Sequence, residues 1–324
     1  MQYDLELKSE IVAQEAGLSL IDYMTDRFTY KTREHWANLI EKGNISLDGK
    51  KAFSNSILSE GMILTFLLPD YFEPDLDTNY HKVFENENII IVSKPANLPI
   101  SSNHKFFKQN MTALLREREN LPDINPIHRI DRETSGLIIY LKKRFETPKA
   151  LRKDPLQIVT GKYYLAIVKG KVTEKNFSCN IPLMDSKDSQ VGYKVTAAEP
   201  GKGKEASTFF SLLGNTDEYS LLLANLKTGR KHQIRAHCSL LGFPIVGDKL
   251  YSHDSRYFIK RRQEDFLSDE DYEILGSTHH LLHAYALRLN LPGKEPELIT
   301  SEFFSQEFQK YLDLFPNWRR MITY

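Results

Sequence analysis

The chain has 324 residues, of which 41% are hydrophobic and 27% are charged, a composition that is ordinary for globular proteins and a length that favours two domains. Its 43 lysines and arginines balance its 43 aspartates and glutamates, so the overall charge does not indicate a nucleic-acid-binding protein. Two cysteines are too few for a disulfide scaffold, and no stretch approaches the roughly 18 apolar residues of a membrane span.

The first residues include acids where a secretory signal would need a basic start and an apolar core. Cys179 and Cys238 lie in different segments without metal-ligand spacing, which favours buried thiols in a reducing compartment. We therefore expect a cytoplasmic protein that does not associate with membranes.

Two short helices are predicted near the start of the chain. Apolar residues recur at helical spacing over residues 20–28 and again over residues 36–40. Thr32 is the expected N-cap of the second helix, and Gly43 is its expected stop signal.

Two strands and a linker follow these helices. Ile45 begins a short apolar stretch that leads into an Asp-Gly turn, and Gly61 begins a second apolar stretch. Residues 70–80 are acidic, contain a proline and lack periodicity, as is typical of a linker. We therefore expect one domain over residues 1–80 and a second over residues 81–324.

The second domain is predicted to consist mainly of strands. A β-branched stretch ends at Lys94, which is a candidate either to hold a phosphate or to support the fold through an ion pair. Helical spacing appears over residues 111–119. Further strand patterns cover residues 137–141, 162–170, 203–213 and 219–226. The last two of these strands are expected to pair as a hairpin across Gly214 and Asn215.

A polar loop precedes the strand at 137–141 and contains one aspartate, Asp131, between Arg129 and Arg132. His128 and the hydroxyl groups of Thr134 and Ser135 lie close by in sequence. These neighbours favour an ionised aspartate that acts as a nucleophile or base toward a phosphate-bearing substrate. The alternative is a simple ion pair at a loop bend.

Cations concentrate around and after this loop, which predicts a basic surface for an RNA partner. A solvated, charged helix is the alternative interpretation. The residues concerned are Arg129, Arg132, Lys142, Lys143, Arg144, Lys149, Arg152 and Lys153.

The string His-Arg-Ile-Asp-Arg-Glu-Thr-Ser-Gly-Leu at residues 128–137 resembles the signature of the RluA family of pseudouridine synthases, which isomerise uridine to pseudouridine within RNA. Three further segments resemble motifs of that family in the expected order: residues 83–99, 162–170 and 226–251. The stretch at 279–289 resembles its last motif. In that family the aspartate that matches Asp131 is catalytic.

The resemblance implies roles for several other residues. Arg235 would pair with Asp131, and Tyr164 would pack beside it, with a ring that can stack on uracil and a hydroxyl group that can exchange a proton. Arg230 and His232 would contact RNA, and Lys94, His128, Arg129, Arg132, Thr134 and Ser135 complete the candidate substrate-binding set.

The fold expected from this resemblance is mixed α+β. A mainly antiparallel sheet would form a cleft that bears Asp131, Tyr164 and Arg235, with helices flanking it. Isomerisation needs neither redox equivalents nor energy input, so no cofactor is expected. His232 and His237 are five residues apart and would point in different directions on a helix or a strand, so no metal site is expected.

Residues 17–67 resemble an S4 domain, a small RNA-binding module, and an appendage that packs without touching RNA is the alternative. An S4-like module favours large-subunit ribosomal RNA as the substrate, and transfer RNA is the alternative. The protein is expected to be a monomer.

Two other functional classes stay open at this stage. One is a non-catalytic RNA-binding protein on this fold, and the other is a nuclease that uses His128, His232 or His237 as acid and base. Residues 252–276 form a polar, charged insert without a recognised motif, which either tunes substrate choice or has no role.

Overall fold

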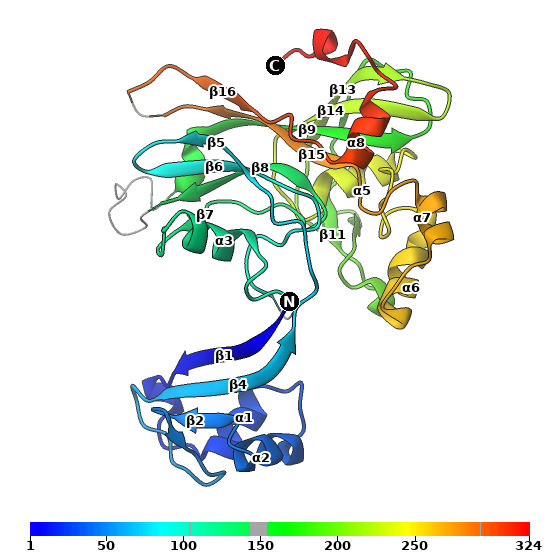
Figure 1. Cartoon of the computed structure of the whole chain (residues 1–324). Coiled ribbons are helices and arrows are strands. Elements are labelled where there is room, and N and C mark those ends of the chain that lie inside the picture. Colours follow the sequence, from blue (N-terminus) through cyan, green and yellow to red (C-terminus); the bar gives the residue numbers. More distant parts are fainter. Residues whose placement is uncertain (104, 143–153, 292) are drawn as a thin grey trace. The chain divides into compact units, whose positions relative to one another are not determined.

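The computed structural model describes residues 1–103, 105–142, 154–291 and 293–324. The chain divides into two compact units, Met1–Asp75 and Leu76–Tyr324 (Figure 1). The expected boundary near residue 80 lies a few residues beyond this division.

The first unit is a four-stranded sheet with two helices (Figure 1). Thr32 caps the second helix by accepting a hydrogen bond from the His35 N–H, and Gly43 follows with a positive φ of 80°, as the sequence predicts. Trp36 and Ile40 are buried in its core. The elements are β1 (Gln2–Glu10), α1 (Leu20–Arg27), α2 (Arg33–Glu41), β2 (Ile45–Leu47), β3 (Lys50–Lys51) and β4 (Ile63–Phe72), with sheet order β1-β4-β2-β3.

β1 is not predicted by the sequence analysis, because its acids and lysine mask a short alternation around Leu5, the buried residue of this strand. Its partner β4 continues to Phe72, which pairs with Gln2. The predicted linker at 70–80 therefore begins inside a strand.

The second unit is built on a large sheet in the order β10-β13-β14-β9-β15-β8-β6-β5 (Figure 1). All of these pairs are antiparallel except β15 with β8. The mixed α+β fold with a mainly antiparallel sheet is thus confirmed. The strands on this path are β5 (His81–Glu85), β6 (Ile89–Lys94), β8 (Ser135–Leu141), β9 (Val159–Lys169), β10 (Asn176–Cys179), β13 (Thr208–Asn215), β14 (Tyr219–Leu226) and β15 (Leu282–Leu289).

The remaining elements flank this sheet. β7 (Asn125–Pro126) pairs with β8, β16 (Glu297–Thr300) pairs with β15, and β11 (Leu183–Asp185) pairs with β12 (Val195–Ala197). The helices are α3 (Met111–Arg118), α5 (Gln233–Leu240), α6 (Arg256–Glu264), α7 (Asp269–Leu275) and α8 (Gln306–Leu312), with 3-10 turns at Ala13–Glu15, Pro155–Ile158, Ser189–Val191, His253–Ser255 and Trp318–Met321. Among the helices of the described residues, none has the length and apolar character needed to cross a bilayer.

The predicted hairpin exists, but its turn lies elsewhere. Gly214 and Asn215 belong to β13, and the chain reverses over the next three residues before β14. A β-bulge between Leu212 and Gly214 accommodates the glycine inside the strand, which is why the glycine signal misplaced the turn.

The core explains the continuous apolar runs in β6 and β8. Alternate residues of both strands enter two different clusters, one with Ile91 and Ile139 and the other with Val92 and Ile138. α3 contributes to the second cluster and covers that face (Figure 1). A strand that is buried on both faces has no polar side to alternate with.

Gly136 lies in the contact between β8 and β15, where it pairs with Ala284. A Cβ atom at this position would lie 2.3 Å from the backbone oxygen of Ala284, and the φ angle is +101°. Only glycine allows this approach, which joins the Asp131 loop to the central strands.

Candidate active site

Asp131 lies in the loop between β7 and β8, next to α5. The Nη1 atom of Arg235 donates a hydrogen bond to Asp131 Oδ2 over 2.7 Å, so the predicted ion pair is present. Burial alone would raise the pKa of Asp131, but the charge and hydrogen bond of Arg235, together with the neighbouring histidines, keep the pKa below its ordinary value. Asp131 is therefore ionised at neutral pH, and its side chain is 27% exposed.

Arg235 is itself held by a second carboxylate, that of Asp248. Its Nε and Nη2 atoms donate to the two oxygens of Asp248 over 2.7 and 2.9 Å. Asp248 is fully buried and also accepts hydrogen bonds from the N–H groups of Leu250 and Tyr251. Although burial opposes ionisation, the charge and hydrogen bonds of Arg235, helped by the Tyr251 N–H, lower the pKa of Asp248 to about 2. The guanidinium is thus fixed on one side and presents its remaining edge to Asp131.

Asp248 is not among the residues predicted to form the site. A signal was available, because a single carboxylate after Phe-Pro-Ile-Val-Gly stands in an apolar run and requires a partner if it is buried. Its partner Arg235 lies in the same family-like segment, residues 226–251.

His232 and Tyr251 complete the surroundings of the ion pair. His232 Nε2 lies 3.7 Å from Asp131 Oδ1, and His232 Nδ1 lies 3.2 Å from the hydroxyl group of Tyr251. The Tyr251 ring packs against the Arg235 guanidinium, with its centroid 5.0 Å from Cζ. Burial lowers the pKa of His232 to about 4, so this imidazole is neutral at pH 7.

Tyr164 lies on β9, in register with Ala224 of β14 and Ala284 of β15. Its side chain is buried. Burial and the nearby charge of Asp131 raise the pKa of the Tyr164 phenol, so it stays protonated at neutral pH. The structure thus brings Tyr164, Arg235 and Asp131 into one electrostatic neighbourhood.

Lys94 is also near Asp131, but it faces the protein interior. The side chain has no exposed surface, and its Nζ atom donates to the backbone oxygens of Pro95 and Arg132 over 2.9 and 3.0 Å. Burial lowers the pKa of Lys94 to about 7, against the attraction of Asp131. This placement disfavours the predicted phosphate contact, and the lysine instead fixes the backbone of the Asp131 loop.

Thr134 and Ser135 are likewise buried, rather than open to a substrate. The Thr134 hydroxyl lies 2.7 Å from His280 Nε2, and the Ser135 hydroxyl lies 2.8 Å from His283 Nδ1. These contacts fasten the end of the loop to β15 and the residues before it. Substrate binding by either hydroxyl group is therefore disfavoured by the structure.

The other residues predicted to contact RNA differ in their exposure to solvent. His128 accepts a hydrogen bond from the Ile139 N–H over 3.2 Å, and burial lowers its pKa to about 3. Arg129 is exposed, and the exposed Arg230 donates from Nε to the backbone oxygen of Glu205 over 2.8 Å. Of the predicted basic surface, Lys143, Arg144, Lys149, Arg152 and Lys153 lie outside the described residues.

Glu133 is a second carboxylate of the same loop that the sequence analysis did not single out. It accepts hydrogen bonds from Lys249 Nζ over 3.0 and 3.1 Å and from the His280 N–H over 3.2 Å. Burial would raise the pKa of Glu133, but the charge and hydrogen bonds of Lys249, with the charges of His280 and Arg235, hold it well below its usual range. The loop is thus anchored on both sides of Arg132.

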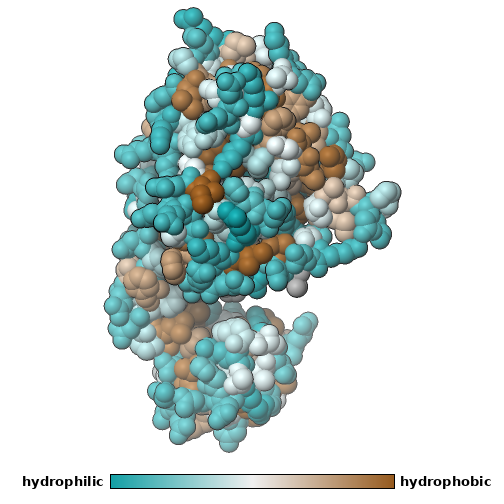
Figure 2. Space-filling view, turned by 90° about the vertical axis from the view of Figure 1, so that its right-hand side faces the viewer, coloured by the Kyte–Doolittle hydropathy of each residue, from teal (hydrophilic) through white to brown (hydrophobic). Residues whose placement is uncertain are grey.

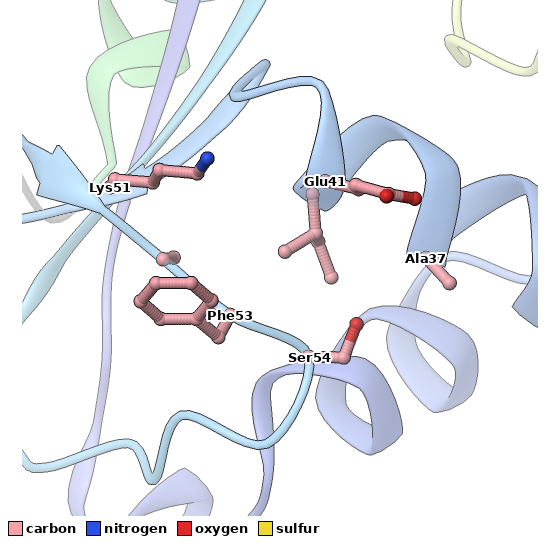
Figure 3. A pocket seen from close by; sticks show the side chains of 7 residues that line it. Ala37, Glu41, Lys51, Phe53 and Ser54 are labelled. Carbon is pink, nitrogen blue, oxygen red and sulfur yellow. The ribbon is translucent and has the colours of Figure 1, made fainter.

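Two shallow surface pockets contain none of the candidate site residues. One belongs to the first unit and is lined by Ala37, Ile40, Glu41, Lys51, Ala52, Phe53 and Ser54 (Figure 3). The other belongs to the second unit and is lined by Ser178, Asn180, Ser207, Phe209, Asn225 and Lys227. Within the described residues, no group of three or more His, Cys, Asp or Glu side chains is arranged to hold a metal ion.

Residues 88–240 match the family model for RNA pseudouridylate synthase. The chain is 28% identical over 288 residues to an uncharacterized RNA pseudouridine synthase of Synechocystis, covering 87% of this chain and 96% of that protein. It is also 28% identical over 238 residues to the mitochondrial tRNA pseudouridine(32) synthase of Saccharomyces cerevisiae, covering 72% of this chain and half of that protein.

A solved structure shares the fold of most of the chain. Human RNA pseudouridylate synthase domain containing 4 superposes with a TM-score of 0.54 at 22% identity, covering 73% of this chain and 93% of that one.

Proposed function

We propose that the chain is a pseudouridine synthase that isomerises specific uridines within structured RNA, with Asp131 as the catalytic residue. The match of residues 88–240 to the family model supports this, and the shared fold is consistent with it. The observation that carries this proposal is the chain of contacts from Asp131 to Arg235 to Asp248. It leaves one ionised, partly exposed carboxylate whose orientation is set by a buried guanidinium.

The reaction moves the bond at ribose C1′ from the nitrogen to carbon 5 of the uracil ring. Because this bond is hidden in stacked RNA, the target nucleotide has to leave the stack, which loop and bulge uridines do at the lowest cost. Asp131 then assists cleavage, either by attacking C1′ or by promoting a glycal intermediate. The base turns within the site before carbon 5 bonds to C1′.

Arg235, His232 and Tyr164 have supporting roles in this proposal. Arg235 keeps Asp131 ionised and aims its oxygens. His232 is neutral and 3.7 Å from Asp131, so it serves as a polar contact and not as a second charge. The protonated phenol of Tyr164 supplies an apolar ring for the uracil and a hydroxyl group for proton exchange.

We further propose that the first unit is an S4-like module that recruits RNA. Its two helices followed by the β2–β3 hairpin support this. In the pocket of this unit, Phe53 is 61% exposed and the Lys51 amine lies 6.0 Å from the centroid of its ring (Figure 3). An exposed ring beside a cation suits a stacked nucleobase.

Large-subunit ribosomal RNA is the proposed substrate, because an S4-like module precedes the catalytic unit. Transfer RNA is the second candidate, favoured by the similarity to a yeast enzyme named for it. Site-by-site pseudouridine mapping, by carbodiimide-dependent reverse-transcription stops, tests both on total RNA from cells with and without the gene.

The expected result is that particular stops vanish without the gene and return with the wild-type protein, but not with Asp131→Asn. The position of those stops identifies the RNA. If no stop depends on the gene, or if Asp131→Asn restores all of them, the proposed function of Asp131 is wrong.

A further inference from the structure

The insert at residues 252–276 contains α6 and α7, which lie on the right of Figure 1. The face on this side of the second unit is mainly hydrophilic (Figure 2). Lys260 of α6 is paired with Asp271 over 2.7 Å, and Arg262 donates to the backbone oxygen of Gln190. Arg261 instead reaches the loop that carries Asp131.

The contact of Arg261 is with Glu133, two residues after Asp131. Its Nη1 atom lies 3.4 Å from Glu133 Oε1. The same carboxylate already has a buried cation, Lys249, at 3.0 Å. Arg132 is a third cation in the group, with Nη2 4.0 Å from Glu133. Glu133 alone therefore cannot neutralise the cations that surround it.

The whole neighbourhood has an excess of positive charge. The buried cations Arg235 and Lys249 are occupied by Asp131, Asp248 and Glu133. Arg132 and Arg261 add two further positive charges beside Glu133. An arrangement of four cations around three carboxylates is suited to an external anion.

Both of these arginines are accessible and have unused donors. Their side chains are 32% and 37% exposed. Within the part of the chain that the structure describes, the Arg132 guanidinium makes no hydrogen bond and that of Arg261 makes one. The buried ring of Phe106, with its centroid 5.7 Å from Arg132 Cζ, holds the first guanidinium in place. Each guanidinium has five N–H donors in a fork that matches phosphate geometry.

We propose that Arg132 and Arg261 together bind one phosphate group of the RNA substrate, directly beside the Asp131 loop. The insert is then part of the substrate-binding surface, and α6 supplies its contact. This inference rests on the proposed function, because RNA is the anion that the reaction brings to this loop. The competing explanation is that Arg261 only stabilises the fold through Glu133.

The test measures binding of a fluorescein-labelled oligouridylate to the full chain over a range of NaCl concentrations. Arg261→Gln and Arg132→Gln each remove one guanidinium, and Lys171→Gln is the control. Lys171 is an exposed cation in the turn after β9 that pairs with Asp217 over 2.7 Å. All three variants change the net charge equally.

We expect each arginine variant to weaken binding about tenfold, the effect of losing a charged hydrogen bond. The slope of log affinity against log salt should become shallower by roughly 0.7, the value for one phosphate on a single strand. The double variant should lose less than the sum of the two, since both arginines hold one phosphate. Lys171→Gln should keep the wild-type slope.

Unchanged affinity and slope in Arg261→Gln, with a lowered melting temperature, would show that the arginine only supports Glu133. Absence of measurable oligouridylate binding by the wild-type protein also contradicts the phosphate site. Arginine-dependent binding without pseudouridine formation on any RNA would leave the phosphate site intact and overturn the proposed function instead.

Discussion

Arg235 binds Asp248 through two nitrogens but reaches Asp131 through a single one. The two-point contact is buried, while Asp131 is partly exposed. Asp248 therefore fixes the position of the Arg235 guanidinium, and the hydrogen bond from Arg235 to Asp131 depends on that position. Each carboxylate should show a different response to substitution.

Asp248→Asn should destabilise the protein by about 3–5 kcal/mol, because it leaves the buried Arg235 with one partner. Activity should fall as well, since the guanidinium loses the contact that aims it at Asp131. Urea unfolding followed by fluorescence measures the first effect. Asp217→Asn, which removes an exposed partner of Lys171, is the control and should change stability by less than about 0.5 kcal/mol. Equal stabilities of the two variants would contradict the assigned role of Asp248.

Asp131→Asn should reduce turnover by about a thousandfold or more, since it removes the charge that acts at C1′. RNA binding should persist, because the cationic residues around the loop are unchanged. Tritium release from RNA labelled at uracil carbon 5 measures turnover, and filter binding measures affinity. A variant that turns over at the wild-type rate would remove Asp131 from the catalytic role.

Arg235→Lys tests whether charge or geometry matters more. A lysine keeps the positive charge but cannot make the two-point contact with Asp248 and the bond to Asp131 together. We expect a large loss of kcat, with a smaller loss of stability than Arg235→Ala shows. If Arg235→Lys is fully active, the orienting role of the guanidinium is wrong.

The sequence predicted those parts of the site that lie in long, specific motifs. Asp131, Arg235 and Tyr164 were assigned by resemblance, and the predicted ion pair between the first two is present in the structure. No role was predicted for Asp248 or Glu133, although the isolated carboxylate of Asp248 in an apolar run indicated a buried partner. Their contacts join segments that are distant in sequence or depend on the path of the chain after α5.

Three residues predicted to bind the substrate are buried for one shared reason. Lys94 ends a strand motif, and Thr134 and Ser135 follow Asp131 in its loop, and these positions suggested contact with the substrate. Whether a polar side chain faces solvent or the interior is decided by tertiary packing, and here all three are buried with partners inside the protein. The turn after β13 was misplaced for a similar reason, because tertiary packing keeps Gly214 inside the strand at a β-bulge.

The buried histidines of the second unit should make the folded protein less stable in acid. Burial lowers the pKa of His283 from 6.5 to about 4, so the unfolded chain takes up a proton before the folded protein does. Stability contributed by neutral His283 is complete above pH 6.5 and decreases as the pH falls toward about 4, by about 1.4 kcal/mol per pH unit. His280 and His128, whose pKa values are lowered to about 3, act in the same direction.

Unfolding free energies measured between pH 7 and pH 4.5 test this dependence. The wild-type protein should lose stability with a slope of more than one proton, and His283→Asn should reduce that slope by about one. His35→Asn removes an exposed histidine of the first unit and serves as the control. A flat profile in the wild-type protein would contradict the prediction.

Removal of the first unit should separate recruitment from chemistry. Residues 1–75 form a unit with its own core, and Asp131, Arg235 and Asp248 all lie in the other unit. A chain lacking residues 1–75 should therefore bind RNA more weakly and show a raised KM, while saturating RNA restores most of kcat.

Because deletion can disturb the rest of the chain, Phe53→Ala and Lys51→Ala provide the finer test, with Ile57→Ala as a control at another exposed apolar residue of the unit. We expect the first two to raise KM and the third to leave it unchanged. Wild-type KM values in the deletion and in both pocket variants would show that this unit does not recruit the substrate.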